Sequence, residues 1–147
     1  MKELKKNVET EIIVRLVECD SYKIAHNSSY FVWFEIGRFD YAKLNGYKIT
    51  SMAADEDVVY FTLFTKCKFI KSVKFDDEII VKTRINKLPI LYAKYSFEQE
   101  IYNKATGELV ARCITENAAI DKKTKKVLKL SLDNEFMRLE RDEDEKQ

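Results

Sequence analysis

The stretch ECDSYKIAHNSSYFVWFEIGR, residues 18–38, decides how the whole sequence is interpreted. It holds the only histidine of the chain, His26, and a polar loop with Asp20 that leads into a segment that is apolar nearly all round. A carboxylate just before a helix lies beside unpaired backbone N–H groups and the positive end of the helix dipole. Because this environment can polarise a carbonyl oxygen, the pattern indicates an active site for acyl transfer.

The segment that begins at Ser29 predicts one long helix. Its aromatic and aliphatic residues cover almost every direction around a helix, so we expect the helix to be enclosed on most sides. Ser28 or Asn27 is the expected N-cap, and Gly46, which follows Asn45, is the expected stop.

The rest of the chain reads mainly as strands. Residues 11–18 predict a first strand, and residues 57–127 predict four or five long antiparallel strands that form a meander. We expect hairpin turns at 75–77, 88–89, 105–107 and 122–125. The inward face of one strand should carry four alternating residues: Ile79, Val81, Thr83 and Ile85. A loop at 47–56, a short helix from Ser131 or Asp133, and a disordered charged tail at about 141–147 are also expected.

Composition limits the class of protein. The chain has 147 residues, 46% of them apolar, so we expect a single domain over residues 1–147. Lys and Arg number 26 against 25 Asp and Glu, a balance that argues against nucleic acid as a partner. No segment is apolar enough for a membrane span or a signal peptide, so we expect a soluble, unprocessed protein. Cys19, Cys67 and Cys113 are far apart in sequence and suggest reduced thiols in the cytoplasm, with no metal site.

One long helix and one antiparallel sheet have one economical arrangement, in which a sheet of five to six strands curls around the helix. The sequence therefore predicts the α+β class.

The residue pattern resembles that of the 4-hydroxybenzoyl-CoA thioesterase-like family of acyl-CoA thioesterases, which have the hotdog fold. The resemblance lies mainly in one block: Asp20, Tyr30, the run Trp33-Phe34-Glu35, and Arg38 occur at the intervals of the family pattern. Residues 75–79 and 119–121 give weaker support. The resemblance implies a central helix inside the sheet and hydrolysis of an acyl-CoA thioester, with CoA as part of the substrate and no separate cofactor.

The resemblance also implies roles for three residues of the loop. Asp20 takes the place of the family carboxylate, which acts either as a nucleophile on the carbonyl carbon or as a general base for water. The backbone N–H near Asn27 would stabilise the oxyanion. His26 either holds a water or the thioester oxygen, or is structural, and the sequence favours neither. Lys23 replaces the Gly that is usual three residues after Asp20, so we expect an ordinary backbone there or a side chain that projects toward a CoA phosphate.

Substrate-binding candidates come from several segments. Tyr22 either lines the acyl pocket or packs on its own sheet, and Tyr30 belongs to an aromatic run that is core with one end near the acyl group. Among a group of lysines that also includes Lys66 and Lys68, the candidates for CoA phosphates are Lys71 and Lys74. We expect a homodimer or homotetramer in which Asp20 faces strand residues of the neighbouring chain: Tyr60, Thr62 and Thr65. Glu35 and Arg38 are expected to form an internal ion pair or an interface bond.

Two alternatives remain open from the sequence. One is a non-catalytic module of the same fold that binds acyl-CoA or acyl-carrier protein. The other is a hotdog dehydratase or hydratase, which the arrangement of Asp20 and His26 disfavours because such enzymes pair a His and an acid differently.

Overall fold

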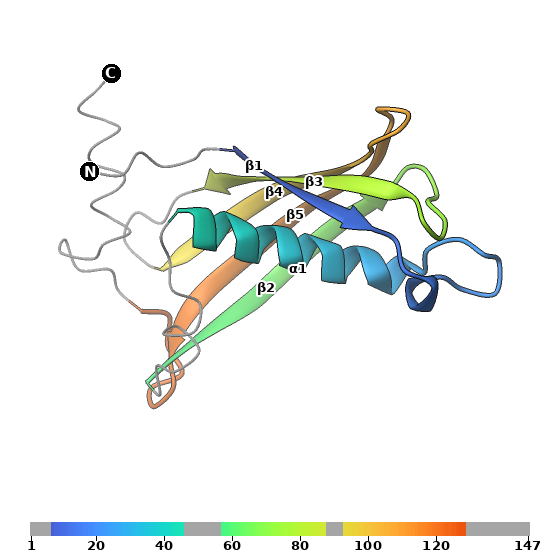
Figure 1. Cartoon of the computed structure of the whole chain (residues 1–147). Coiled ribbons are helices and arrows are strands. Elements are labelled where there is room, and N and C mark those ends of the chain that lie inside the picture. Colours follow the sequence, from blue (N-terminus) through green and yellow to red (C-terminus); the bar gives the residue numbers. More distant parts are fainter. Residues whose placement is uncertain (1–6, 46–56, 88–92, 129–147) are drawn as a thin grey trace, which may run out of the picture.

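A computed structural model describes residues 7–45, 57–87 and 93–128 of the chain. One α-helix lies along one face of an antiparallel sheet of five strands (Figure 1). In chain order the elements are β1 (Asn7–Ile13), the 3₁₀ turn η1 (Leu16–Glu18), α1 (Asn27–Leu44), β2 (Val58–Phe69), β3 (Glu78–Lys87), β4 (Lys94–Asn103) and β5 (Leu109–Asp121).

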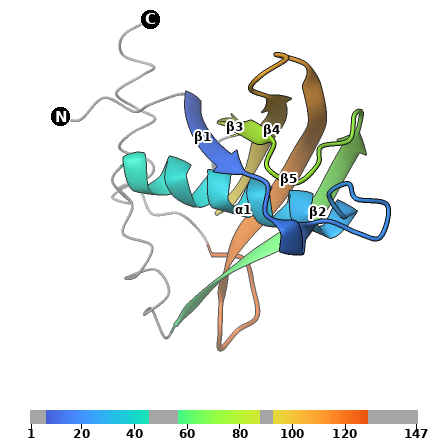
Figure 2. The ribbon, with the colours of Figure 1, turned by 45° about the vertical axis from the view of Figure 1, so that its right-hand side comes forward.

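The sheet has the strand order β1-β3-β4-β5-β2 and curves around the helix (Figure 2). This confirms the α+β arrangement and the expected meander of β3, β4 and β5. The hairpin expected at 75–77 is wrong, because β2 does not pair with β3 but crosses to the far edge and pairs with β5. The cause lies in the connection: the Ala25 N–H donates to the Val73 carbonyl, and Ile24 forms a bridge with Lys74. The connection from β2 to β3, residues 70–77, thus pairs with the loop that precedes α1.

The first strand also differs from the sequence prediction. It begins at Asn7 and ends at Ile13. The next residue, Val14, donates its N–H to the Asp77 carbonyl. The end of the predicted strand instead forms η1, because the Glu18 carboxylate accepts a hydrogen bond from the Arg15 backbone N–H at 2.8 Å.

The helix packs against β1 and β3 through Trp33, Phe34 and Gly37. A Cβ on Gly37 would lie 2.7 Å from Thr83 Oγ1 and 2.8 Å from Val81 Cγ1, so only glycine allows this close approach. Gln99 Nε2 donates to the Phe34 carbonyl at 2.8 Å and ties the helix to the middle of the sheet. The expected inward face of β3 is confirmed: Ile79, Val81 and Thr83 are buried and Ile85 is half-buried.

The expectation that the helix is enclosed on most sides is wrong for the single chain. One face is buried, but the opposite face leaves Phe31, Val32, Ile36 and Phe39 each more than a third exposed. The helix packs mainly on the β1 side of the curved sheet, so the part of the inward face of β2 from Tyr60 to Thr65 stays open as well. Further along β2, Cys67 packs against the core and Phe69 contacts the Tyr30 ring. Apolar groups on both surfaces therefore remain in contact with water unless another molecule covers them.

Several sequence predictions fall outside the described residues. These are the loop at 47–56, the stop at Gly46, the turn at 88–89, the helix from Ser131 or Asp133 and the tail at 141–147. In the described ranges no helix has the length and apolar character to cross a membrane.

Candidate active site

The loop that carries Asp20 is a tight hairpin. Cys19 pairs with Ala25, and the Asp20 N–H donates to the Ile24 carbonyl at 2.8 Å. The Asp20 carbonyl accepts from the Lys23 N–H at 3.0 Å, and Asp20 Oδ1 accepts from the Tyr22 N–H at 2.8 Å. The half-buried carboxylate is therefore held in a fixed orientation by its own turn.

Lys23 has φ of 64°, so the expectation of an ordinary backbone at this position is wrong. A three-residue hairpin loop needs a left-handed residue at its last position, and glycine fills this position most readily. The hydrogen bonds of the hairpin hold Lys23 in that conformation at a cost of roughly 1 kcal/mol. The backbone conformation that Gly would favour is thus available here with Lys in its place.

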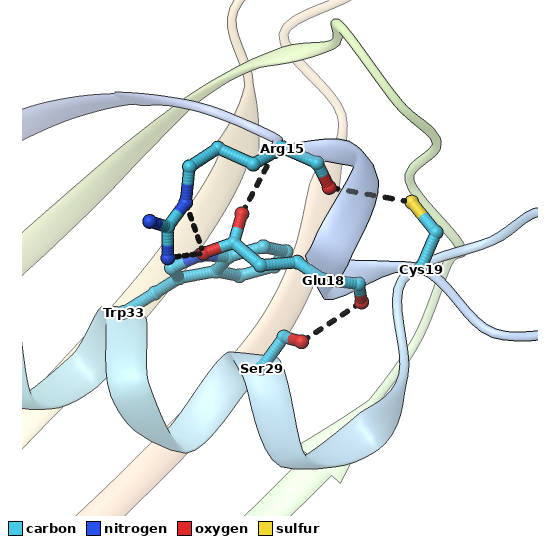
Figure 3. A network of polar contacts seen from close by, with 5 residues as sticks. All are labelled: Arg15, Glu18, Cys19, Ser29 and Trp33. Carbon is cyan, nitrogen blue, oxygen red and sulfur yellow. Dashed lines mark hydrogen bonds and ion pairs between the residues drawn. The ribbon is translucent and has the colours of Figure 1, made fainter.

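Glu18 connects the Asp20 loop to the helix (Figure 3). Its carboxylate accepts hydrogen bonds from the Arg15 guanidinium at 2.9 Å and from Trp33 Nε1 at 3.1 Å. Its backbone carbonyl accepts from the His26 N–H and from Ser29 Oγ, both at 2.8 Å. Glu18 thus fixes three segments relative to one another: Arg15 after β1, the end of the loop at His26, and the first turn of α1.

Opposing effects act on the pKa of the Glu18 carboxyl. Burial alone would raise this pKa, but the hydrogen bonds from Arg15 and Trp33 and the positive charge of Arg15 outweigh burial and lower it. Glu18 is therefore ionised at neutral pH. All its bonds are to groups of the fold itself, so it supports the site and does not react.

The sequence reasoning missed Glu18 and its partner Arg15. A signal was present, because a Glu three residues after the start of a helical turn can cap the N–H at that start. The spacing from Arg15 to Glu18 has this form, although the β-branched residues around it favoured a strand.

The helix starts two residues earlier than expected. His26 is the N-cap, and its Nδ1 accepts from the Ser28 N–H at 3.1 Å and lies 2.7 Å from Ser28 Oγ. The expected caps Ser28 and Asn27 are the second and first residues of α1. The cap defines a structural role for His26, and it places the Asn27 N–H at the helix start, where backbone donors lack intrahelical acceptors.

The lysine candidates lie beside this loop in the segment that follows β2. Lys74 is exposed and bridges to Ile24, which brings it next to the Asp20 hairpin. Lys71 is also exposed and forms an ion pair with Glu108. Tyr30 is buried, its hydroxyl donates to the Lys71 carbonyl at 3.5 Å, and burial raises the pKa of that hydroxyl. The structure therefore brings residues 20–26, the helix start and residues 71–74 together.

The three strand candidates share the inward face of β2. Tyr60, Thr62 and Thr65 lie opposite residues of β5 that are buried on that face: Ala119, Asn117 and Thr115. The register shift between Thr62 and Phe64 keeps Thr62 and Thr65 on the same side although they are three residues apart. All three candidates are exposed in the single chain.

Two further candidates behave differently from expectation. Tyr22 is 84% exposed at the tip of the hairpin, so it does not pack on its own sheet. Among the described residues Glu35 and Arg38 form no close ion pair; Arg38 Nη1 instead donates to Gln99 Oε1 at 3.0 Å, and the charge of Glu35 acts on Arg38 from further away. Burial lowers the pKa of the Arg38 guanidinium.

The fold agrees with comparisons to known proteins. Residues 14–138 match the description of the thioesterase-like superfamily, and the chain belongs to this family. Its reaction class is therefore thioester hydrolysis, and the predicted hotdog fold is confirmed.

Three relatives illustrate the likeness. Bacillus subtilis YneP, whose name assigns it provisionally to the acyl-CoA thioesterases, is 27% identical over 114 residues, which cover 78% of this chain and 80% of YneP. DHNA-CoA thioesterase from Staphylococcus aureus has a TM-score of 0.80 and 26% identity, covering 96% of this chain and 91% of its own. A crystal structure of 4-hydroxybenzoyl-CoA thioesterase with 4-hydroxybenzoyl-CoA has a TM-score of 0.76 and 12% identity, covering 92% and 99%.

Proposed function

We propose that this protein hydrolyses acyl-CoA thioesters to free acid and CoA, and that the Asp20 carboxylate carries the reaction. The observation that supports this most is the hairpin itself. It holds a half-buried carboxylate by one backbone hydrogen bond. It also reverses the chain, so that α1 begins directly after the hairpin. The names of the three relatives refer to acyl-CoA, DHNA-CoA and 4-hydroxybenzoyl-CoA thioesters, which supports CoA as the thiol carrier.

Two routes use the same carboxylate. In one, an Asp20 oxygen attacks the thioester carbon, the C–S bond breaks, and water then hydrolyses the mixed anhydride. In the other, Asp20 takes a proton from water as that water attacks. In both routes the carbonyl oxygen gains negative charge, which the Asn27 N–H and the positive helix end are suited to stabilise.

The site is proposed to be completed by a second copy of the chain. β2 is an edge strand of 12 residues with exposed apolar side chains, which include Phe61, Leu63 and Phe64. Such an edge pairs readily with another strand. In a homodimer, or in a tetramer built from two dimers, the inward residues of β2 would face Asp20 of the neighbouring chain: Tyr60, Thr62 and Thr65.

The CoA end of the substrate is proposed to contact Lys74, since this exposed residue forms a backbone bridge with Ile24 of the Asp20 hairpin. Lys71 already has a carboxylate partner in Glu108, and Lys23 lies at the hairpin tip. We place the reaction in the cytoplasm, in keeping with the three free cysteines.

The test is a panel of aliphatic and aromatic acyl-CoAs, with release of the CoA thiol followed in a colorimetric assay. Wild type should release thiol from at least one substrate, and Asp20→Asn should not. Asn keeps the oxygen that accepts from the Tyr22 N–H, so the hairpin should survive the change. Asp76→Asn is the matched control, because it removes the same charge at an exposed turn with φ of 70°, which Asn tolerates. Substrate binding without thiol release by wild type would favour the non-catalytic module.

A further inference from the structure

Cys67 and Cys113, which are 46 residues apart in sequence, are direct partners across β2 and β5. Their distance in sequence predicts reduced thiols and gives no sign of this pairing. In the structure both side chains of this pair join the core beneath α1, where Cys113 is buried and Cys67 is half-buried. Cys19 pairs with Ala25 at the base of the Asp20 hairpin.

The register places the pair where two antiparallel strands bring side chains closest. The Ile70 N–H donates to the Val110 carbonyl at 2.8 Å, so residues 70 and 110 stand at a hydrogen-bonded position of the β2–β5 ladder. Bonded and non-bonded pairs alternate along antiparallel strands, so the pair three residues further along, Cys67 and Cys113, is non-bonded. Cα atoms of such pairs are about 4.5 Å apart, which lies within the range that a disulfide spans.

The polar surroundings of the pair favour a thiolate. The hydrogen bond from Cys67 lowers the pKa of Cys113 to about 7; burial opposes this, and a hydrogen bond from Thr115 and the charge of Arg38 add to the lowering. The same bond and burial raise the pKa of Cys67. A thiolate beside a protonated thiol is the arrangement that precedes disulfide formation.

We propose that Cys67 and Cys113 form a reversible disulfide, a modification site that reacts with hydrogen peroxide and is restored by thiol reductants. The inference is independent of the hydrolysis proposed above, because neither sulfur takes part in that reaction. It places the modification on the inward face of β2, next to Thr65.

The chemistry balances with one peroxide molecule. The Cys113 thiolate attacks a peroxide oxygen, the O–O bond breaks, and the departing hydroxide takes up a proton to form water. Cys67 then loses its proton, its sulfur attacks the sulfenic sulfur, and the second hydroxide leaves as water. Counted from two thiols, one peroxide is reduced, one S–S bond forms and two waters are released.

The experiment uses the full chain carrying Cys19→Ser, so that only the pair remains. The reduced protein is treated with one equivalent of hydrogen peroxide, quenched with catalase, denatured and alkylated. We expect both thiols of each chain to be lost and then recovered after dithiothreitol. The intact mass before alkylation should fall by two hydrogen atoms, and one proteolytic fragment should join residues 67 and 113.

Two matched variants carry Cys67→Ser or Cys113→Ser on the same background. The chain with Cys67→Ser keeps Cys113 and should gain oxygen instead of losing hydrogen. The chain with Cys113→Ser keeps Cys67, the pKa of which burial raises, and should react more slowly. Proteolytic mapping of the peroxide-treated wild-type chain gives the same answer without relying on any variant to fold. Thiols that stay free, oxygen gained by the two-cysteine chain, or a link that joins separate chains would overturn the proposal.

Discussion

Glu18 and Asp20 are two residues apart, yet their environments suit different tasks. The Glu18 carboxylate accepts hydrogen bonds from Arg15 and Trp33, and its lowered pKa reflects these donors. Within the described residues the Asp20 carboxylate accepts one hydrogen bond, from the turn that holds it, and is half-buried. A carboxylate occupied on both oxygens supports structure, whereas one held from one side can meet a substrate.

Replacing Glu18 with Gln should destabilise the fold in a pH-dependent way. The folded-state pKa of Glu18 lies below the unfolded one, so its stabilisation is present above the unfolded pKa and disappears as pH falls through the folded pKa. We expect Glu18→Gln to lower the free energy of unfolding by about 1.5–3 kcal/mol at pH 7, and the gap from wild type to narrow below about pH 4.5. Urea unfolding of both proteins at pH values from about 7 to below about 4.5 measures the difference in the free energy of unfolding. Glu116→Gln, at an exposed position, is the control. An equal gap at all pH values would contradict the ionised role.

Relieving the backbone at Lys23 should stabilise the protein. Lys23→Gly removes the left-handed penalty, and because glycine also loses more entropy on folding, the net gain should be up to about 1 kcal/mol. Lys66→Gly, within β2, should instead destabilise. The midpoint of urea unfolding reports both. A loss of stability for Lys23→Gly would mean that the Lys23 side chain has a contact that outweighs the strain.

At the scale of elements, the periodicities of the sequence predicted the helix and the inward face of β3 correctly. They could not predict that β2 leaves the meander, because a strand's partner depends on hydrogen bonds from distant residues. The connection between β2 and β3 is bound at Val73 and Lys74 by Ala25 and Ile24. The strand before this connection, β2, therefore pairs with β5. Asp20 could be proposed as a site residue from its local pattern, whereas the role of Glu18 depends on Trp33, which is 15 residues away in sequence.

The helix start offers a test that separates stability from chemistry at His26. His26→Ala removes the cap on the Ser28 N–H and should cost about 1 kcal/mol of stability, whereas His26→Asn should keep most of it. If His26 acts only as the cap, the rate of thiol release by His26→Asn should stay within about threefold of wild type. Thermal unfolding and acyl-CoA hydrolysis measure the two effects. A stable His26→Asn variant with a large fall in rate would show that the imidazole also acts in the chemistry.

At the scale of the whole molecule, the two edges of the sheet should behave differently. Phe64→Lys places a charge on the apolar edge strand β2, and burial of such a side chain contributes about 1.5–3 kcal/mol. We therefore expect the dimer dissociation constant to rise at least about tenfold, with hydrolysis falling in parallel. Ile13→Lys is the control, since Ile13 is 56% exposed on the opposite edge strand β1. Sedimentation at several concentrations measures both. A dimer lost through Ile13→Lys and kept by Phe64→Lys would place the interface on β1.

The kinetic comparison of Asp20→Asn with wild type on the best substrate of the panel tests the account most directly. The turnover rate is measured at saturating acyl-CoA, and the dissociation constant is measured separately by calorimetry with a non-hydrolysable thioether analogue. The account predicts that turnover falls at least about 100-fold, while the dissociation constant changes by less than about threefold because the hairpin keeps its backbone hydrogen bonds. Turnover of Asp20→Asn within about threefold of wild type would contradict a catalytic Asp20.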